Sequence, residues 1–252
     1  MEYVRLGKSN LLVSRVSLGS MRLSESNADD AANLVRSAYD AGVNFFDTSR
    51  RYPQSERLLG DALYDIRKNV ILSTTTSAST PNEIRSNLEE SLMVFHCDYM
   101  DLYQYETESY VPMAGDADKI YDTLAELKKQ GKIKHIGLVT QDYDTAVRAI
   151  RSGLYETIQF PFSVITTEES QQVVQLCQEN DIGFIAMQPL GGGVVENLPL
   201  AIGFLQQYEN VVPLWGTTKQ SNLEQILYFN EHPPVIDDQF KLDAEYQKRF
   251  FN

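Results

Sequence analysis

The sequence feature that most constrains the fold is a unit that repeats eight times, a short apolar or β-branched run followed by an amphipathic helical pattern. Strands that alternate with helices form a parallel sheet, and eight is the strand number that closes into a barrel. The predicted strands cover residues 13–18, 43–47, 70–74, 99–105, 133–139, 157–160, 183–187 and 211–215. The predicted helices cover residues 31–41, 55–63, 81–95, 117–129, 142–152, 167–180, 198–207 and 221–229.

We therefore predict one α/β domain over residues 1–252, a single (β/α)8 TIM-type barrel. Residues 3–13 alternate in polarity and turn at 7–10, which predicts a short N-terminal β-hairpin. The main alternative is an open doubly wound sheet, in which Gly-x-Gly-x-x-Gly would follow the first strand. Here Leu18-Gly19-Ser20-Met21-Arg22 follows it, so we favour the closed barrel. Caps are predicted at residues 80–83 and 166–169, and Gly42 and Gly131 end two helices.

Charge and composition exclude several classes of function. The net charge is −13 and the pI about 4.7, which argues against nucleic acid and anionic membrane partners. No apolar run has membrane-spanning length, and the N-terminus lacks the pattern of a secretion signal. The three histidines and the two cysteines, Cys97 and Cys177, make no metal-ligand spacing. We expect a cytoplasmic protein with reduced thiols, no metal and a small-molecule substrate; the sequence does not fix its oligomeric state.

In such a barrel the loops after the strands carry the chemistry. Asp47 ends the second strand, and Tyr52 follows five residues later. Taken alone, this pair also suits a turn-capping Asp and a Tyr that packs in the loop. The long segment 106–116 after the fourth strand is a candidate lid, or simply a bridge to the next helix. Candidate substrate contacts are Tyr110 and Met113 in this segment and Met21 after the first strand.

Motifs along nearly the whole chain are similar to those of the aldo-keto reductase family. They are Leu6-Gly7-Lys8-Ser9, Gly42-Val43-Asn44-Phe45-Phe46-Asp47-Thr48, Ser55-Glu56-Arg57-Leu58-Leu59-Gly60, Asp98-Tyr99-Met100-Asp101-Leu102-Tyr103-Gln104, Gly131-Lys132-Ile133-Lys134-His135-Ile136-Gly137 and Pro189-Leu190-Gly191-Gly192-Gly193. The closing segment 247–252 resembles the lead-in to a Cys-rich tail of one bacterial branch, and this sequence ends before such cysteines.

The resemblance implies a reductase that acts on carbonyls with NADPH through an Asp, a Tyr, a Lys and a His. Asp47 and Tyr52 match the first two positions. Thr75 stands where the Lys is expected, and Glu106 where the His is expected. Without an ammonium group nearby, a phenol with a pKa near 10 has no electrostatic reason to release its proton at neutral pH. Glu106 beside Asp47 is expected to raise the pKa of at least one of the two carboxyl groups.

Arg50 and Arg51 offer a replacement for the missing positive charge, because a guanidinium is always ionised. The alternative, which we slightly favour, is that both arginines are solvated loop charges. The resemblance also implies a dinucleotide site, of which Gln159 and the Gly216-Thr217-Thr218-Lys219 segment are retained. Val139-Thr140 replaces the family's Ser-Asn pair, and Asn222 and Ile226 do not suit its later contacts.

Three functions follow, and the sequence ranks them close together. The first is cofactor-independent acid–base chemistry of the lyase, dehydratase or isomerase type, with Tyr52, Glu106 and Asp47 acting on a small polar substrate. The second is an NAD(P)H-dependent oxidoreductase in which Arg50 or Arg51 and Glu106 compensate for the lost groups. The third is a catalytically silent binding or regulatory protein. We expect the first, with no cofactor, and keep NADPH as the alternative.

Overall fold

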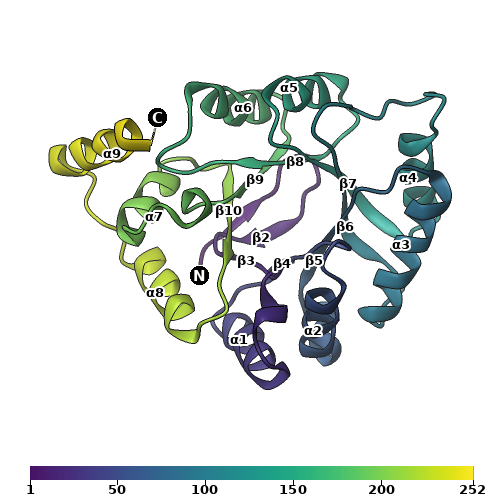
Figure 1. The fold of residues 1–252 in the computed structure, drawn as a ribbon, viewed down its shortest axis with the longest axis horizontal. Helices are drawn as coiled ribbons and strands as arrows, with labels where there is room; N and C mark the ends of the chain where they lie inside the picture. Colours follow the sequence, from purple (N-terminus) through teal and green to yellow (C-terminus); the bar gives the residue numbers. More distant parts are fainter. Residues whose placement is uncertain (252) are drawn as a thin grey trace.

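The computed structural model describes residues 1–251 and contains a closed barrel of eight parallel strands, as predicted. Around the barrel the order is β10, β3, β4, β5, β6, β7, β8 and β9, with β9 beside β10 again (Figure 1). The strands are β3 (Ser17–Gly19), β4 (Phe45–Asp47), β5 (Ile71–Thr76), β6 (Met100–Glu106), β7 (Ile133–Val139), β8 (Thr157–Pro161), β9 (Gly183–Met187) and β10 (Val211–Gly216).

Helices surround the barrel, and all eight predicted ones are present (Figure 1). Among the described residues, no helix is long and apolar enough to cross a bilayer. The predicted helices are α1 (Ala28–Asp40), α2 (Pro53–Leu63), α3 (Pro81–Val94), α4 (Ile120–Lys129), α5 (Tyr143–Ser152), α6 (Glu168–Glu179), α7 (Leu198–Gln206) and α8 (Gln220–Glu231). A further helix, α9 (Asp238–Phe251), follows them. Short 3-10 turns are η1 (Leu23–Glu25), η2 (Tyr64–Asn69) and η3 (Gly191–Gly193).

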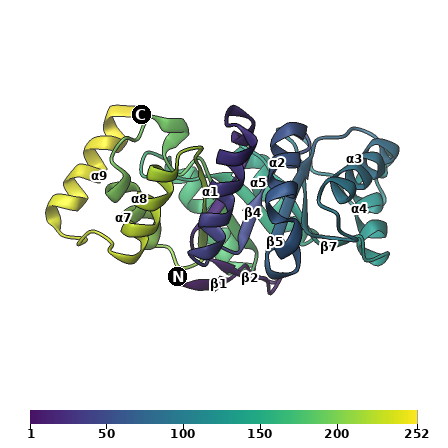
Figure 2. The ribbon, with the colours of Figure 1, turned by 90° about the horizontal axis from the view of Figure 1, so that it is seen from below.

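The N-terminal hairpin closes one end of the barrel. It consists of β1 (Tyr3–Arg5) and β2 (Leu12–Ser14) and lies below the barrel in Figure 2. Leu6 and Val13 pack with interior side chains such as Phe45 in one buried apolar cluster. Gly7 has φ +53°, and a Cβ there would lie 2.1 Å from the backbone nitrogen of Gly183. Only glycine permits this close contact. Because the hairpin covers this end of the barrel, the opposite end, where the loops after the strands lie, is left for chemistry.

Several predicted boundaries were wrong. The predicted strand 13–18 is two strands, because Val13 belongs to the hairpin and β3 begins at Ser17. Helix α4 begins at Ile120 rather than at residue 117, and α9 was not predicted. Thr80 forms the predicted capping box with Glu83, whereas Thr167 makes no side-chain cap at the start of α6, and the Thr166 hydroxyl donates to the carbonyl of Ser163. Asn252, the last residue of the predicted tail lead-in, lies outside the described residues.

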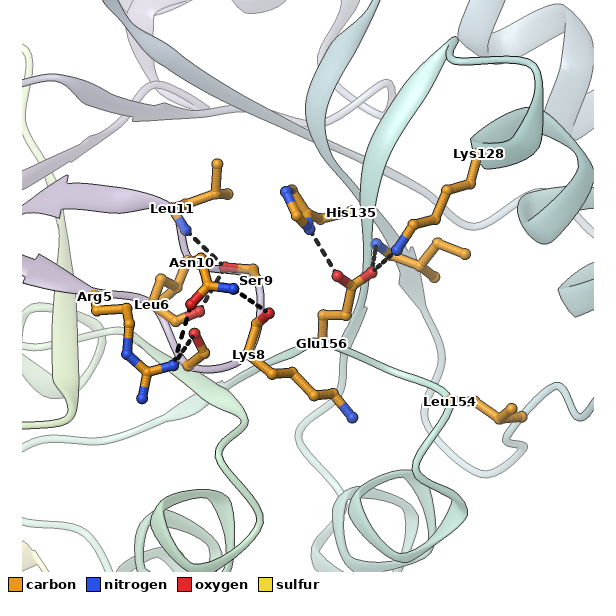
Figure 3. A network of polar contacts seen from close by, with 12 residues as sticks. Arg5, Leu6, Lys8, Ser9, Asn10, Leu11, Lys128, His135, Leu154 and Glu156 are labelled. Carbon is orange, nitrogen blue, oxygen red and sulfur yellow. Dashed lines mark hydrogen bonds and ion pairs between the residues drawn. The ribbon is translucent and has the colours of Figure 1, made fainter.

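A polar network at the closed end links β7 and the segment before β8 to α4. The Glu156 carboxylate contacts Nδ1 of His135 at 2.7 Å and Nζ of Lys128 at 2.5 Å, and accepts the Ile136 N–H at 3.1 Å (Figure 3). Burial alone would raise the pKa of Glu156, but these contacts outweigh it and lower the pKa to about 2. Lys8 of the hairpin turn reaches the same region and donates to the carbonyl of Gly153.

Replacing Glu156 with Gln should lower the free energy of unfolding at pH 7 by roughly 2 kcal/mol, because a neutral amide leaves Lys128 without its charged partner and weakens the contact with His135. The folded-state pKa lies below the value of 4.5 for a free carboxyl, so this stabilisation is complete above about pH 4.5 and is lost as the pH falls towards 2. Urea unfolding at pH 7 and pH 3 measures it. Glu89→Gln, which removes an exposed pair with Lys132, is the control, with an expected loss of about 0.5 kcal/mol or less. A Glu156→Gln effect that is the same at both pH values would contradict the prediction.

Candidate active site

Asp47 lies at the open end of the barrel, at the last position of β4. Its side chain is 2% exposed. Burial raises the pKa of this carboxyl to about 7, although hydrogen bonds from Ser73, Gln104 and Gln159 act to lower it. An Asp carboxyl that titrates near neutrality can both take up and release a proton under physiological conditions.

Gln104 connects the polar groups of the barrel interior. Its Nε2 lies 3.3 Å from Oδ1 of Asp47, 3.1 Å from Oγ of Ser73 and 2.7 Å from Oε1 of Gln159. Strands β4, β5, β6 and β8 thus each contribute a polar side chain to one layer of the barrel interior. This layer lies nearer the open end than the apolar cluster that contains Phe45. Gln104 and Ser73 were not singled out in the sequence. Side chains two residues apart on a strand point to the same face. Ser73 and Gln104 could therefore have been found in the sequence, because they lie two residues before Thr75 and Glu106.

Arg50 is not a solvated loop charge, because it is only 17% exposed and its partners are two glutamates. Its guanidinium pairs with the fully buried Glu56 and, at 3.0 Å, with Glu90. Glu56 also accepts hydrogen bonds from Thr74 at 2.9 Å and Ser91 at 2.7 Å. Arg50 therefore completes a charge network between α2, β5 and α3. Glu56 was quoted only as part of a motif, and its partners lie too far away in sequence to be inferred.

Arg51 and Glu106 form an ion pair at the rim of the barrel, 3.3 Å apart. Arg51 is 55% exposed and Glu106 is 22% exposed, so water screens this pair. We expected a raised pKa for at least one of the carboxyl groups of Asp47 and Glu106; that of Asp47 is raised, but burial and not Glu106 is the cause. Tyr52 is 39% exposed and occupies the N-cap position of α2. Among the described residues, no Lys or Arg side chain is paired with Asp47.

Thr75 lies on β5 opposite Gln104 of β6, and its side chain is 4% exposed. Its carbonyl accepts the backbone N–H of Arg50 at 2.9 Å, so the loop after β4 is anchored on the strand that carries Thr75. The position expected to hold a Lys is therefore next to Gln104 and close to the Asp47 layer, but it supplies only a hydroxyl group.

The candidate substrate contacts lie on two loops, Tyr110 and Met113 after β6 and Met21 after β3. The Tyr110 hydroxyl is hydrogen-bonded to Asp116 at 2.6 Å and to Asp118, and burial together with these carboxylates raises the pKa of the phenol. Met113 is 39% exposed, and its N–H donates to the same Asp116. These bonds give the segment after β6 a fixed conformation. Met21 is 45% exposed after β3.

Some of the residues at the positions of a dinucleotide site are engaged by the protein itself, and others are accessible. Oε1 of Gln159 accepts from Gln104, as described above, and Gln159 is 6% exposed. Thr140 is fully buried, and its hydroxyl accepts the N–H of Asp142. In the loop after β10, the Thr217 hydroxyl accepts the N–H of Lys219 at 3.1 Å, whereas Gly216 and Thr218 remain accessible to solvent.

A polar cleft of about 490 Å³ lies between the N-terminal ends of α5 and α6 and is lined by none of Asp47, Tyr52 and Glu106. Its lining includes Asp142, Tyr143, Phe160 and Glu169. Within the described part of the chain, no group of three or more His, Cys, Asp or Glu residues has a metal-binding arrangement.

Comparison with known proteins agrees with this fold. The Aldo/keto reductase family model matches residues 15–201. A "Probable aldo-keto reductase 1" from Glycine max is 30% identical and aligns with 88% of this chain and 82% of its own length. The chain therefore belongs to the aldo-keto reductase family.

Solved structures show the same barrel. An aldo-keto reductase from Bacillus halodurans, in its holo form, superposes with a TM-score of 0.85 at 18% identity, over 98% of this chain and 96% of that one. A putative aldo-keto reductase from Pseudomonas aeruginosa gives a TM-score of 0.81 at 20% identity, over 91% and 95% of the two chains. At these identities the likeness is one of fold.

Proposed function

We propose that this barrel catalyses cofactor-independent acid–base chemistry on a small polar organic substrate, as a lyase, dehydratase or isomerase. The observation that carries the proposal is the Asp47 carboxyl, which is buried, has a pKa of about 7 and has no ammonium or guanidinium partner among the described residues. A strongly shifted pKa in a barrel interior next to the catalytic loops is typical of a group that transfers protons. On the family pattern, the Lys that would hold this carboxyl ionised is replaced by Thr75.

Each residue then has a definite role. Asp47 exchanges a proton with the substrate, and Gln104 orients its carboxyl through Nε2. Tyr52, exposed at the rim, donates a hydrogen bond to a substrate oxygen. Glu106 stands where the family's His is expected; held by Arg51, it serves as the second proton acceptor. Because the Asp47 side chain is only 2% exposed, only a small group of a substrate can reach it, which favours a small substrate.

The residues present do not suit a nicotinamide. The amide oxygen of Gln159 and the hydroxyl of Thr140, which stand where the family contacts the nicotinamide amide, are both turned into the protein. The Thr217 hydroxyl likewise occupies the Lys219 N–H, one of the amides that a phosphate would use. These contacts support a site that works without a dinucleotide. Free Cys97 and Cys177 suit a reducing, cytoplasmic location.

The second candidate is an NAD(P)H-dependent oxidoreductase, which the family membership favours. It requires a positive charge next to Tyr52 or Asp47. The engagement of Arg50 by Glu56 and Glu90 removes one source of that charge, and Arg51 pairs with Glu106. We therefore place this function behind acid–base chemistry.

A direct test is solvent hydrogen exchange. The purified chain is incubated in D2O, without dinucleotide, with a panel of small hydroxy and oxo acids, and deuterium incorporation or elimination is followed by proton NMR. The proposal expects at least one compound to exchange or eliminate well above the buffer rate. If no compound responds without dinucleotide but reduction appears when NADPH is added, the oxidoreductase is correct.

Glu106→Gln should lower that activity about 10-fold or more, because the amide cannot accept a proton while it keeps the shape of the side chain. The pH profile should keep the ionisation near pH 7, which belongs to Asp47. Glu90→Gln, which removes the exposed partner of Arg50, is the control and should leave the profile in place. Unchanged turnover in Glu106→Gln would remove Glu106 from the mechanism.

A further inference from the structure

Helix α9 has two separate apolar faces, and the barrel covers only one. Phe240 is 7% exposed and packs against Gly203 of α7, and Ala244 one turn later also contacts the core. Leu242, Tyr246 and Phe250 recur every four residues on another face and are 61%, 67% and 69% exposed. Figures 1 and 2 show α9 at the edge of the molecule, next to α7 and outside the ring of barrel helices.

This second face is continuous rather than a scatter of exposed side chains. Residues four apart on a helix are neighbours. The rings of Tyr246 and Phe250 stack with centroids 6.3 Å apart. Val235 and Ile236, in the segment that leads into α9, are 79% and 39% exposed and extend the apolar surface. An exposed stripe of this kind marks a surface that a partner covers.

The distribution of charge along α9 favours a second copy of this chain as the partner. The first half of α9 carries two acidic residues and one basic one, Asp238, Asp243 and Lys241, whereas the second half carries two basic residues and one acidic one, Lys248, Arg249 and Glu245. Two copies of such a helix in antiparallel orientation place the acidic half of one against the basic end of the other. Parallel copies would oppose like charges. A two-fold axis also requires the same patch on both subunits, which one self-complementary helix satisfies.

We propose that α9 is a dimerisation helix, and that its Leu242–Tyr246–Phe250 stripe pairs antiparallel with the same stripe of a second copy of this chain. The two-fold axis passes close to Tyr246, the middle of the stripe, so Leu242 of one copy faces Phe250 of the other. Arg249 then lies near Glu245 of the partner, in addition to its bond to Glu245 of its own chain. A stable dimer buries roughly 800 Å² on each subunit. A single helix and its lead-in cover less, so the dimer dissociates on dilution.

Sedimentation velocity of the full chain over a wide concentration range tests this proposal. Wild type is expected to shift from a monomer of 28.6 kDa to twice that mass with rising concentration. Tyr246→Lys should remain monomeric throughout. Met93→Lys, on α3, is the matched control because Met93 is 68% exposed and the change in charge is the same; it should dimerise like wild type.

A charge swap distinguishes the antiparallel pair from other contacts. Arg249→Glu should weaken dimerisation about three-fold, and the double variant Glu245→Arg/Arg249→Glu should restore it, because an exposed pair contributes less than about 1 kcal/mol. A wild type that is monomeric at every concentration overturns the proposal. So does a dimer that survives Tyr246→Lys, or a stripe that binds lipid vesicles instead of a second copy.

Discussion

Replacing Asp47 with Asn is expected to abolish activity while making the protein more stable at alkaline pH. If Asp47 carries the proton, its loss should reduce dinucleotide-free turnover by about 100-fold or more. The stability effect has the opposite sign because the carboxyl is buried without a positive partner. Its folded-state pKa of about 7 lies above the value of 3.8 for a free Asp. The folded protein therefore resists ionisation of this group.

The pH range of the effect follows from those two pKa values. The contribution of the Asp47 carboxyl to stability is fully present below about pH 4 and is lost as the pH rises through about 7. At pH 8 the Asn variant avoids that loss and should be more stable than wild type by up to about 4 kcal/mol, at 1.36 kcal/mol for each unit of pKa. Urea unfolding at pH 5 and pH 8 measures it. Asp61→Asn on α2, where Asp61 is 59% exposed, is the control and should change neither property.

An Asp47→Asn variant that is less stable than wild type at pH 8 would contradict a buried, unpaired carboxyl. Such a result would mean that a cation approaches Asp47 in solution. Arg51, with its 55% exposed side chain, would then be the first residue to examine.

Replacing Thr75 with Lys should reverse the character of the site. An ammonium within about 4–6 Å of a carboxyl lowers its pKa by about 1–3 units. Asp47 would then be ionised throughout the neutral range and could no longer release and recapture a proton. We expect the midpoint of the Asp47 titration, followed by carbon-13 NMR of the labelled carboxyl, to fall from about 7 to between about 4 and 6. Dinucleotide-free activity should fall about 100-fold.

Thr75→Met is the matched control, since Met has a similar reach and no charge. It should leave the midpoint at or above its wild-type value, because it removes water without supplying a cation. If Thr75→Lys leaves the Asp47 titration unchanged, position 75 is not the one that governs this carboxyl, and the correspondence with the family's Lys is wrong.

The sequence predicts the barrel well because its signal is repetitive and local. Each strand and its following helix can be identified from their own residues, and eight such units leave little choice of topology. The boundary errors occur where local pattern is ambiguous. Val13 and Ser17 lie in one apolar run, and only the barrel geometry assigns Val13 to the hairpin. Helix α9 was missed because its two apolar faces blur the period expected of a helix that packs on one side.

The strand ends that carry the candidate site residues were predictable, but the contacts of these residues were not. Asp47 and Tyr52 were located from their place after a strand. Arg50 pairs with Glu56, which in turn binds Thr74 and Ser91. These partners come from three different elements, and no spacing in the sequence indicates that they meet. The same holds for Gln104, whose partners lie on neighbouring strands. The charged groups that lie near Asp47 therefore depend on how side chains from different strands are oriented, which the sequence does not show.

The central claim, that this barrel works without a nicotinamide cofactor, is tested most directly by titrating the purified chain with NADPH and NADH. The heat of binding and the fluorescence of the reduced nicotinamide are followed together. We predict no saturable binding of either dinucleotide at micromolar concentrations and no change in the thermal unfolding midpoint. Saturable binding at low micromolar concentrations that is lost in Gln159→Leu would contradict the claim and identify the chain as an oxidoreductase.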